Sequence, residues 1–226
     1  MKDCLSIVIP TKNAAAGLEA TLTAVAGRAI VKEVVVADGG STDATVDQAN
    51  AAGARVVTAE GGRGPQLARG AEAASGAWLL FLHGDTKLGP GWDDAVRRHV
   101  GDPANVRRAA CFRFALDDTA RAARRLERVV AWRTRRLGLP YGDQGMLISR
   151  AFYDEIGGFR PLALMEDVDL VRRIGRGRLV AMDCPAVTSA RRYRESGYLW
   201  RSGRNLACLA LYFLGLSPAF LARIYG

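Results

Sequence analysis

The 226-residue sequence has few of the residues that build metal centres or disulfide frameworks. Its four cysteines, Cys4, Cys111, Cys184 and Cys208, are scattered without a CxxC pair, and no histidine lies at metal-ligand spacing from them. A structural zinc site or a disulfide-stapled fold is therefore not expected. Because 49% of the residues are apolar, the chain can bury a sizeable core without such crosslinks. Reduced thiols in a cytoplasmic protein are the simpler interpretation.

Long apolar runs are also scarce. The first ten residues, MKDCLSIVIP, contain too short an apolar run for a secretory signal peptide. The C-terminal stretch LACLALYFLGLSPAFLARIYG (206–226) is barely long enough to cross a membrane, and Gly215, Ser217 and Pro218 interrupt it. A helix that packs on the protein or lies at a membrane interface is expected there instead. The predicted location is the cytoplasm, with peripheral attachment to the inner face of the membrane as an open alternative.

Familiar phosphate-binding motifs are absent. The stretch GGRGPQLARGAEAASG (61–76) is rich in glycine, but it is neither GxGxxG nor a Walker sequence. Basic residues outnumber acidic ones by 32 to 23, a net charge of +9, and nearly all of them are arginine. This charge suits an anionic membrane surface, nucleic acid or a phosphate-bearing small molecule, and it also suits a merely solvated surface. Aromatic residues are sparse, which argues against binding of single-stranded nucleic acid.

Strand and helix patterns alternate through the first hundred residues. Apolar runs that predict strands are separated by stretches with helical spacing at 17–29, at 43–52 and after the glycine-rich segment. This order predicts an α/β fold with a mostly parallel sheet and helices on both sides. The predicted strands are LSIVIP (5–10), EVVVAD (33–38), RVVTA (55–59) and WLLFLH (78–83).

Polar residues follow three of these strands. Thr11 and Asn13 come after the first, Asp38 ends the second, and Asp85 follows the fourth. Ligands of parallel α/β sheets bind beyond the carboxyl ends of the strands, so these side chains are expected to share one crevice.

Two of these aspartates have competing interpretations. Asp38 begins DGGSTDAT (38–45) and can accept hydrogen bonds from a ribose or a base, although a turn with Ser41 or Thr42 as helix N-cap is the alternative. Asp85, beside Gly84, can bind a divalent cation that bridges phosphate oxygens, or it can cap the turn before Thr86.

The second half of the chain has a different character. A strongly basic helix is predicted at 121–137, a strand and helix at 146–158, a loop leading into a helix at 162–175, and a strand at 179–187. Without repeats or linkers, one domain is predicted over 1–226. Within it, the first half (1–100), the second half (101–195) and an apolar helical tail (196–226) are distinguished.

Charged clusters in this half are ambiguous when taken alone. Glu166 and Asp167 can supply a general base or can serve as first-turn acids that favour the helix dipole. Arg191, Arg192 and Arg194 can bind phosphate oxygens or form a solvated basic face.

Taken together, the motifs resemble the inverting family-two glycosyltransferases of the GT-A fold. The resemblance covers roughly residues 5–195 and looks closest to a bacterial subgroup labelled as arsenosugar-biosynthesis glycosyltransferases. The matching segments are SIVIPTKN (6–13), VVADGGSTDAT (35–45), GRGPQLARGAEAASGAWLLFLHGDT (62–86), GDQGMLISRAFYDEIGGF (142–159) and EDVDL (166–170).

The resemblance implies that 1–100 is a nucleotide-binding half and 101–195 an acceptor and catalytic half. The donor pocket would take a nucleotide-diphosphate sugar, linked to UDP or GDP. Pro10, Thr11 and Asn13 would line the nucleoside pocket. Asp38 would bind the base or ribose, and Arg69 would approach the base.

The resemblance also implies a metal and diphosphate end of the site. Asp85 would be the last acid of a DxD motif that binds a divalent cation, Mn²⁺ or Mg²⁺. His83 replaces the first acid of that motif, which removes one carboxylate, and it can instead hydrogen-bond the ribose. Gly84 lies between them, and Arg191 and Arg192 would help to hold the diphosphate.

The remaining implied roles concern the reaction. Gln144 and Gly145 would lie near the donor sugar or the acceptor. In the pair formed by Glu166 and Asp167, Asp167 would be the catalytic base that deprotonates an acceptor hydroxyl, so that the anomeric configuration inverts.

Two other functions stay open from the sequence. A nucleotidyltransferase would also need a nucleotide crevice and a metal, but the glycine-rich loop expected after its first strand is replaced by PTKNAAAG. A non-enzymatic basic module would bind a membrane or nucleic acid through 121–137 and the tail, and nucleic acid is the less expected partner. The apolar tail could equally serve a homodimer.

Overall fold

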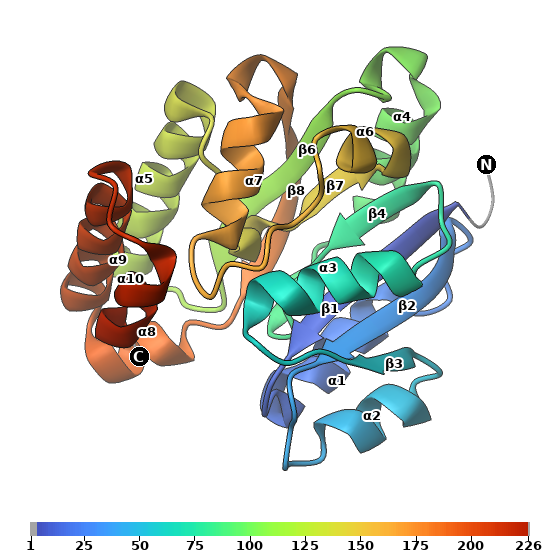
Figure 1. Ribbon diagram of the computed structural model, residues 1–226, viewed down its shortest axis with the longest axis horizontal. Helices are drawn as coiled ribbons and strands as arrows, with labels where there is room; N and C mark the ends of the chain where they lie inside the picture. Colours follow the sequence, from blue (N-terminus) through green and yellow to red (C-terminus); the bar gives the residue numbers. More distant parts are fainter. Residues whose placement is uncertain (1–3, 226) are drawn as a thin grey trace.

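A computed structural model describes residues 4–225 and contains one eight-stranded sheet (Figure 1). The strand order is β3-β2-β1-β4-β7-β6-β8-β5. Strands β5 and β7 run antiparallel to their neighbours, and the other six share one direction. The predicted mostly parallel α/β sheet is therefore confirmed. The strands are β1 (Leu5–Thr11), β2 (Val31–Asp38), β3 (Arg55–Thr58), β4 (Trp78–Phe81), β5 (Thr86–Leu88), β6 (Ala109–Leu116), β7 (Met146–Ser149) and β8 (Leu179–Thr188).

Helices cover both faces of this sheet, as Figure 1 shows. On one face, Leu18 and Trp92 of α1 and α4 pack in the same apolar cluster as Ile7. On the other face, Leu67 of α3 and Leu170 of α7 share a cluster with Val8. Val8 follows Ile7 in β1, so its side chain points to the opposite face of the sheet. The helices are α1 (Ala15–Val25), α2 (Thr45–Ala51), α3 (Arg63–Ala73), α4 (Trp92–Gly101), α5 (Arg121–Leu137), α6 (Arg150–Glu155), α7 (Glu166–Ile174), α8 (Arg191–Ser196), α9 (Tyr198–Phe213) and α10 (Pro218–Tyr225).

The strand register brings the polar strand ends to one edge. Thr11 pairs with Asp38 across β1 and β2, and Val8 pairs with Phe81 across β1 and β4. Because these strands are parallel, the segment that follows Phe81, which includes Asp85, emerges at the same edge as the loop after Thr11.

Several elements differ from the sequence prediction. Between residues 84 and 120 no element was predicted, yet the structure has β5, α4 and β6 there. The first helix ends at Val25 rather than 29, before Gly27 with its positive φ of 66°. The apolar tail is two helices instead of one, since Gly215 adopts a φ of 93° between α9 and α10.

The C-terminal helices pack near the carboxyl end of β6. Phe114 and Leu116 of β6 share a small apolar cluster with Ala123 and Val130 of α5, and Tyr198 of α9 packs against it. Figure 1 places α5, α8, α9 and α10 together at this end. Within residues 4–225, no helix is long and apolar enough to cross a membrane.

Candidate active site

Two adjoining cavities open at the polar edge of the sheet. The strand-tip chamber, of about 430 Å³, lies between the loop after β1, the start of α3 and the start of α8. The α7 chamber, of about 170 Å³, lies between the end of β4, the start of α7 and the inner side of α9. The two chambers share seven lining residues, which are Arg63, His83, Asp85, Leu164, Glu166, Ser189 and Arg192.

The loop after β1 supplies much of the strand-tip chamber, including Pro10, Thr11 and Asn13. Asn13 adopts a left-handed φ of 50°, which is uncommon for a residue other than glycine. Three hydrogen bonds hold it to the loop after β2. Its backbone N–H donates to Ser41 Oγ at 2.8 Å, and its Oδ1 accepts from the Thr42 N–H at 2.9 Å and from the Thr42 hydroxyl at 3.4 Å. The two strand-tip loops therefore form one braced unit.

Asp38 is not free at its strand tip, contrary to the sequence interpretation. Its side chain is 4% exposed and accepts hydrogen bonds from Thr11 Oγ1 (3.0 Å), the Gly40 N–H (3.0 Å) and both the N–H and the hydroxyl of Ser41 (2.8 and 2.5 Å). Burial alone would raise the pKa of Asp38, but these hydrogen bonds lower it below its usual value. The predicted N-cap role of Ser41 or Thr42 is also wrong, because α2 is preceded by Ala44 and has no side-chain cap.

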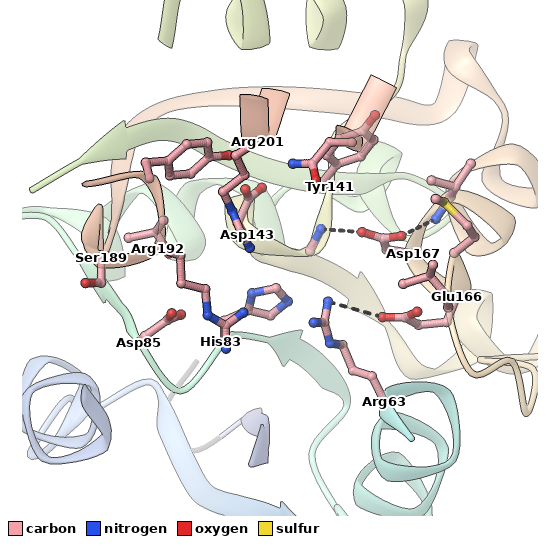
Figure 2. Close-up of a pocket in the computed structure, with 17 residues that line it drawn as sticks. Arg63, His83, Asp85, Tyr141, Asp143, Glu166, Asp167, Ser189, Arg192 and Arg201 are labelled. Carbon is pink, nitrogen blue, oxygen red and sulfur yellow. Dashed lines mark hydrogen bonds and ion pairs between the residues drawn. The ribbon is translucent and has the colours of Figure 1, made fainter. Parts of the chain in front are cut away.

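Asp85 lies on the wall common to both chambers. Figure 2 shows it among the residues that line the α7 chamber. The chain turns here, with the His83 carbonyl accepting from the Thr86 N–H at 3.2 Å, and then enters β5. Among the described residues no hydrogen bond or ion pair to the Asp85 carboxylate is found, so the capping interpretation has no support. The carboxylate is instead directed to the cavity.

His83 lies between the Asp85 side and the Glu166 side of the site in Figure 2. Burial, together with the charges of Arg63 and Arg192, lowers the pKa of His83 well below its usual value, so the imidazole is neutral at pH 7. A Cβ on Gly142 would come within 2.6 Å of His83 Nε2, so only glycine lets this loop approach the ring so closely.

The donor set fits a cation that arrives with a phosphate ligand better than a resident ion. Within residues 4–225, no group of three or more His, Cys, Asp or Glu side chains could hold a metal. A divalent ion coordinated by phosphate oxygens and water needs only one or two protein carboxylates, and Asp85 can provide one.

The start of α7 brings two acidic side chains to the α7 chamber. Met165, just before the helix, has a left-handed φ of 65°, the other positive value outside glycine in the described chain. Asp167 Oδ2 accepts from the Gly142 N–H at 2.8 Å, and its Oδ1 accepts from the Val168 N–H at 2.7 Å. Backbone strain of this kind concentrates at functional sites.

Glu166 is more deeply buried than its neighbour. It is 2% exposed, and its Oε1 lies 3.4 Å from Arg63 Nη1. Burial and the adjacent Asp167 raise the pKa of Glu166 to about 7, although Arg63 opposes the rise. Glu166 is thus partly protonated at neutral pH.

Sequence reasoning missed a third acid, Asp143. It lies within the GDQG segment and lines the α7 chamber with Tyr141. Burial raises the pKa of Asp143 to about 6, against the charge of Arg133 and with help from Asp167. In the described structure its Oδ1 is buried without a hydrogen-bond partner. The segment resembles the family motif, but nothing in its sequence indicates which residue faces the cavity.

Arginines complete the walls. Arg191 lines the strand-tip chamber and pairs with Glu195 at 3.6 Å, whereas Arg192 faces both chambers. Arg201 of α9, which sequence reasoning also missed, enters the α7 chamber and lies over the ring of Tyr193 at 5.4 Å.

Three other predicted residues lie away from both chambers, and Asp38 lies behind the strand-tip loops. Arg69 is on the exposed side of α3 and pairs with Glu72 at 3.2 Å. Gln144 is buried, and its side-chain amide donates to the Phe112 carbonyl at 3.0 Å. Gly145, with a φ of 64°, packs beside the phenyl ring of Phe112. The structure brings together the other predicted residues and leaves these in structural positions.

Comparison with known proteins identifies the family. The model of the family described as "Glycosyl transferase family 2" matches residues 6–157, which is more than half of the chain. The chain belongs to this family. The family-level resemblance inferred from the motifs is therefore confirmed.

Relatives and solved structures agree with this assignment. Glycosyltransferases of PGL/p-HBAD biosynthesis from Mycobacterium bovis and Mycobacterium tuberculosis are 42% identical over 91 residues. The match covers 37% of this chain and only 36% of each relative. Glucosyl-3-phosphoglycerate synthase from M. tuberculosis, solved with Mn²⁺, UDP and glucosyl-3-phosphoglycerate, superposes with a TM-score of 0.59 at 21% identity. That superposition covers 81% of this chain and 70% of the synthase, and it shows a shared GT-A fold.

Proposed function

We propose that this family 2 glycosyltransferase moves a sugar from a nucleotide-diphosphate donor to an acceptor hydroxyl with inversion of configuration. The observation that carries the proposal is the pair of joined chambers, with Asp85 and Arg192 on their common wall and Asp167 across the α7 chamber. One chamber suits a nucleotide and the other an acceptor. The narrower resemblance to arsenosugar enzymes stays a prediction.

The donor is assigned to the strand-tip chamber. The nucleoside lies along Pro10, Thr11 and Asn13, and its diphosphate reaches the wall where Arg192 can neutralise charge as the bond to the sugar breaks. A divalent cation, held by Asp85 and the diphosphate, would supply further charge stabilisation for the leaving group. Crystals of the M. tuberculosis synthase with UDP-glucose and Mn²⁺, or with UDP and Mg²⁺, favour a UDP-linked donor and such a cation.

The acceptor is assigned to the α7 chamber. Asp167 takes the proton of the acceptor hydroxyl, while the Gly142 and Val168 N–H groups fix the orientation of its carboxylate. A single displacement follows, and it inverts the anomeric carbon. Glu166, buried against Arg63, holds that arginine at the boundary between the chambers.

Calorimetric titration with UDP and GDP, each with and without Mn²⁺, tests the donor assignment. We expect Mn²⁺-dependent binding of one nucleotide, lost in Asp85→Ala and retained in Asp47→Ala, an exposed acid of α2. When sugar nucleotides are then screened as donors, sugar transfer should release the nucleoside diphosphate. Release of pyrophosphate would instead indicate a nucleotidyltransferase. Folded protein that binds neither nucleotide would contradict the proposal.

A further inference from the structure

The exposed apolar side chains of the molecule are gathered at one end. Of the ten large hydrophobic residues that are well exposed in the described chain, nine lie on α5, α9, the turn after α9, or α10. The exception is Val106. The nine are Val129, Trp132, Leu137, Leu199, Trp200, Leu206, Phe213, Leu214 and Phe220.

The outer side of α9 forms a continuous apolar strip. Leu199, Leu206 and Phe213 recur every seven residues and therefore lie along one side of the helix. Trp200 and Leu214 form a parallel row, and the exposed positions between the two rows are small residues. Leu199 is 90% exposed, Leu214 77% and Trp200 72%, so nothing in the described structure covers the strip.

Positive charge is concentrated on the helix next to this strip. Helix α5, which packs against α9, carries seven arginines and one glutamate, a net +6. Arg125, Arg135 and Arg136 are exposed, and among the described residues no ion pair neutralises them. An apolar strip beside unpaired arginines, with tryptophans at 72% and 57% exposure, is the composition of a surface that lies in a lipid headgroup layer.

We propose that the outer face of α9 and α10, with the arginines of α5, docks on an anionic phospholipid bilayer. The charge decides against a second copy, because a two-fold contact through this patch would bring the basic α5 helices of both copies together. Nucleic acid would engage the arginines but leave the leucines and phenylalanine in water.

Docking in this way has a consequence that rests on the proposed function. The inner side of α9 contributes Arg201 and Asn205 to the α7 chamber, while its outer side would contact lipid. The acceptor chamber would then lie beside the headgroups, and the acceptor class would be a hydroxyl presented at the bilayer surface, such as the headgroup of a lipid.

Co-sedimentation of the whole chain with vesicles tests the docking. The protein should pellet with vesicles of phosphatidylcholine and phosphatidylglycerol, much less with phosphatidylcholine alone, and less as salt is raised. Leu199→Ser combined with Trp200→Ser and Leu206→Ser should weaken partitioning at least about tenfold. Arg125→Gln with Arg135→Gln and Arg136→Gln should weaken it and flatten its salt dependence.

The matched control is Val106→Ser. Among the described residues it changes the one well-exposed large apolar side chain that lies outside α5, α9, the turn after α9 and α10, and it should partition like the wild type. Wild-type protein that stays in the supernatant with anionic vesicles overturns the proposal. So does a wild-type dimer, seen by analytical ultracentrifugation, that the triple serine variant converts to monomer. Binding of soluble UDP, measured on each variant, checks folding without lipid. It also separates failure of the docking from failure of the glycosyltransferase assignment.

Discussion

The two chambers that meet at Asp85 treat their polar groups differently. Around the strand-tip chamber, the side chains of Asp38 and Asn13 form hydrogen bonds with other protein groups, and these bonds hold the loops after β1 and β2 together. In the α7 chamber, Asp143 Oδ1 is buried without a hydrogen-bond partner among the described residues. Glu166 Oε1, on the wall common to both chambers, has only the ion pair with Arg63 at 3.4 Å. Unsatisfied buried acceptors cost stability and persist where function needs them.

The difference indicates a division of labour. A rigid frame of hydrogen-bonded loops is preorganised, which suits recognition of a nucleotide. Carboxyl groups with raised pKa values suit proton transfer and acceptor binding, where charge changes during the reaction. Each of the following substitutions tests one side of this comparison.

The largest effect is expected at Asp167. Replacing it with asparagine keeps the hydrogen bond from Gly142 and removes the base, so the transfer rate should fall about 10²- to 10⁴-fold. Nucleotide binding, measured by calorimetry, should stay near the wild-type value because the donor chamber is unchanged. Undiminished transfer by Asp167→Asn would contradict its role as the base.

On the frame side, Asp38→Ala should cost folding stability. The substitution leaves the N–H groups of Gly40 and Ser41 and the Thr11 hydroxyl without their acceptor, a loss of about 3 kcal/mol. Urea unfolding measures it, and Asp47→Ala, at an exposed position of α2, should change stability by less than about 0.5 kcal/mol. A stable Asp38→Ala protein with lost nucleotide binding would instead indicate direct contact with the donor.

The sequence also predicted one of these two sides better than the other. The strand-tip side follows from local signals: apolar β-branched runs set the strands, and parallel pairing brings Thr11, Asp38 and Asp85 to one edge. The sequence interpretation missed the direction of the Asp38 carboxylate. Three of its four hydrogen bonds come from Gly40 and Ser41 in the same loop, and only the one from Thr11, 27 residues earlier, depends on how two loops meet.

The α7 side depends on longer-range packing. Asp143 and Arg201 come to one cavity from a turn before β7 and from α9, which are nearly sixty residues apart. Neither lies in a pattern that distinguishes it from a solvated charge. The region 84–120 is different, because the sequence does carry local signals of a helix there that the prediction left out. Helix α4 has acidic residues in its first turn and basic residues in its last turn, namely Asp93, Asp94, Arg98 and His99.

The raised pKa of Glu166 predicts pH-dependent stability. With a pKa of about 7 in the folded chain against 4.5 unfolded, the folded state holds a proton that the unfolded state releases between these values. Stability should therefore fall as pH rises from 5 to 8, by about 2 kcal/mol from this group. Glu166→Gln should flatten the dependence, measured by urea unfolding at each pH.

Asp143, with a raised pKa of about 6, should leave part of the slope in the Glu166→Gln protein. Glu19→Gln, at an exposed position of α1, is the control and should retain the whole wild-type slope. Equal slopes for the wild type and Glu166→Gln would show that Glu166 is ionised throughout this range.

The smallest effect is expected at Arg69, where family resemblance and geometry give opposite predictions. A side chain that contacts the base should weaken nucleotide binding strongly when it is removed. In the structure, however, Arg69 pairs with Glu72 on the outer side of α3, and both side chains are more than half exposed. Such surface pairs contribute about 0–1 kcal/mol to stability, and one outside the chamber contributes nothing to binding. Arg69→Ala should therefore bind UDP like the wild type, whereas Arg192→Ala should not. A large loss of affinity in Arg69→Ala would mean that α3 turns this arginine toward the base when the nucleotide binds, and the strand-tip frame would then be less rigid than its hydrogen bonds indicate.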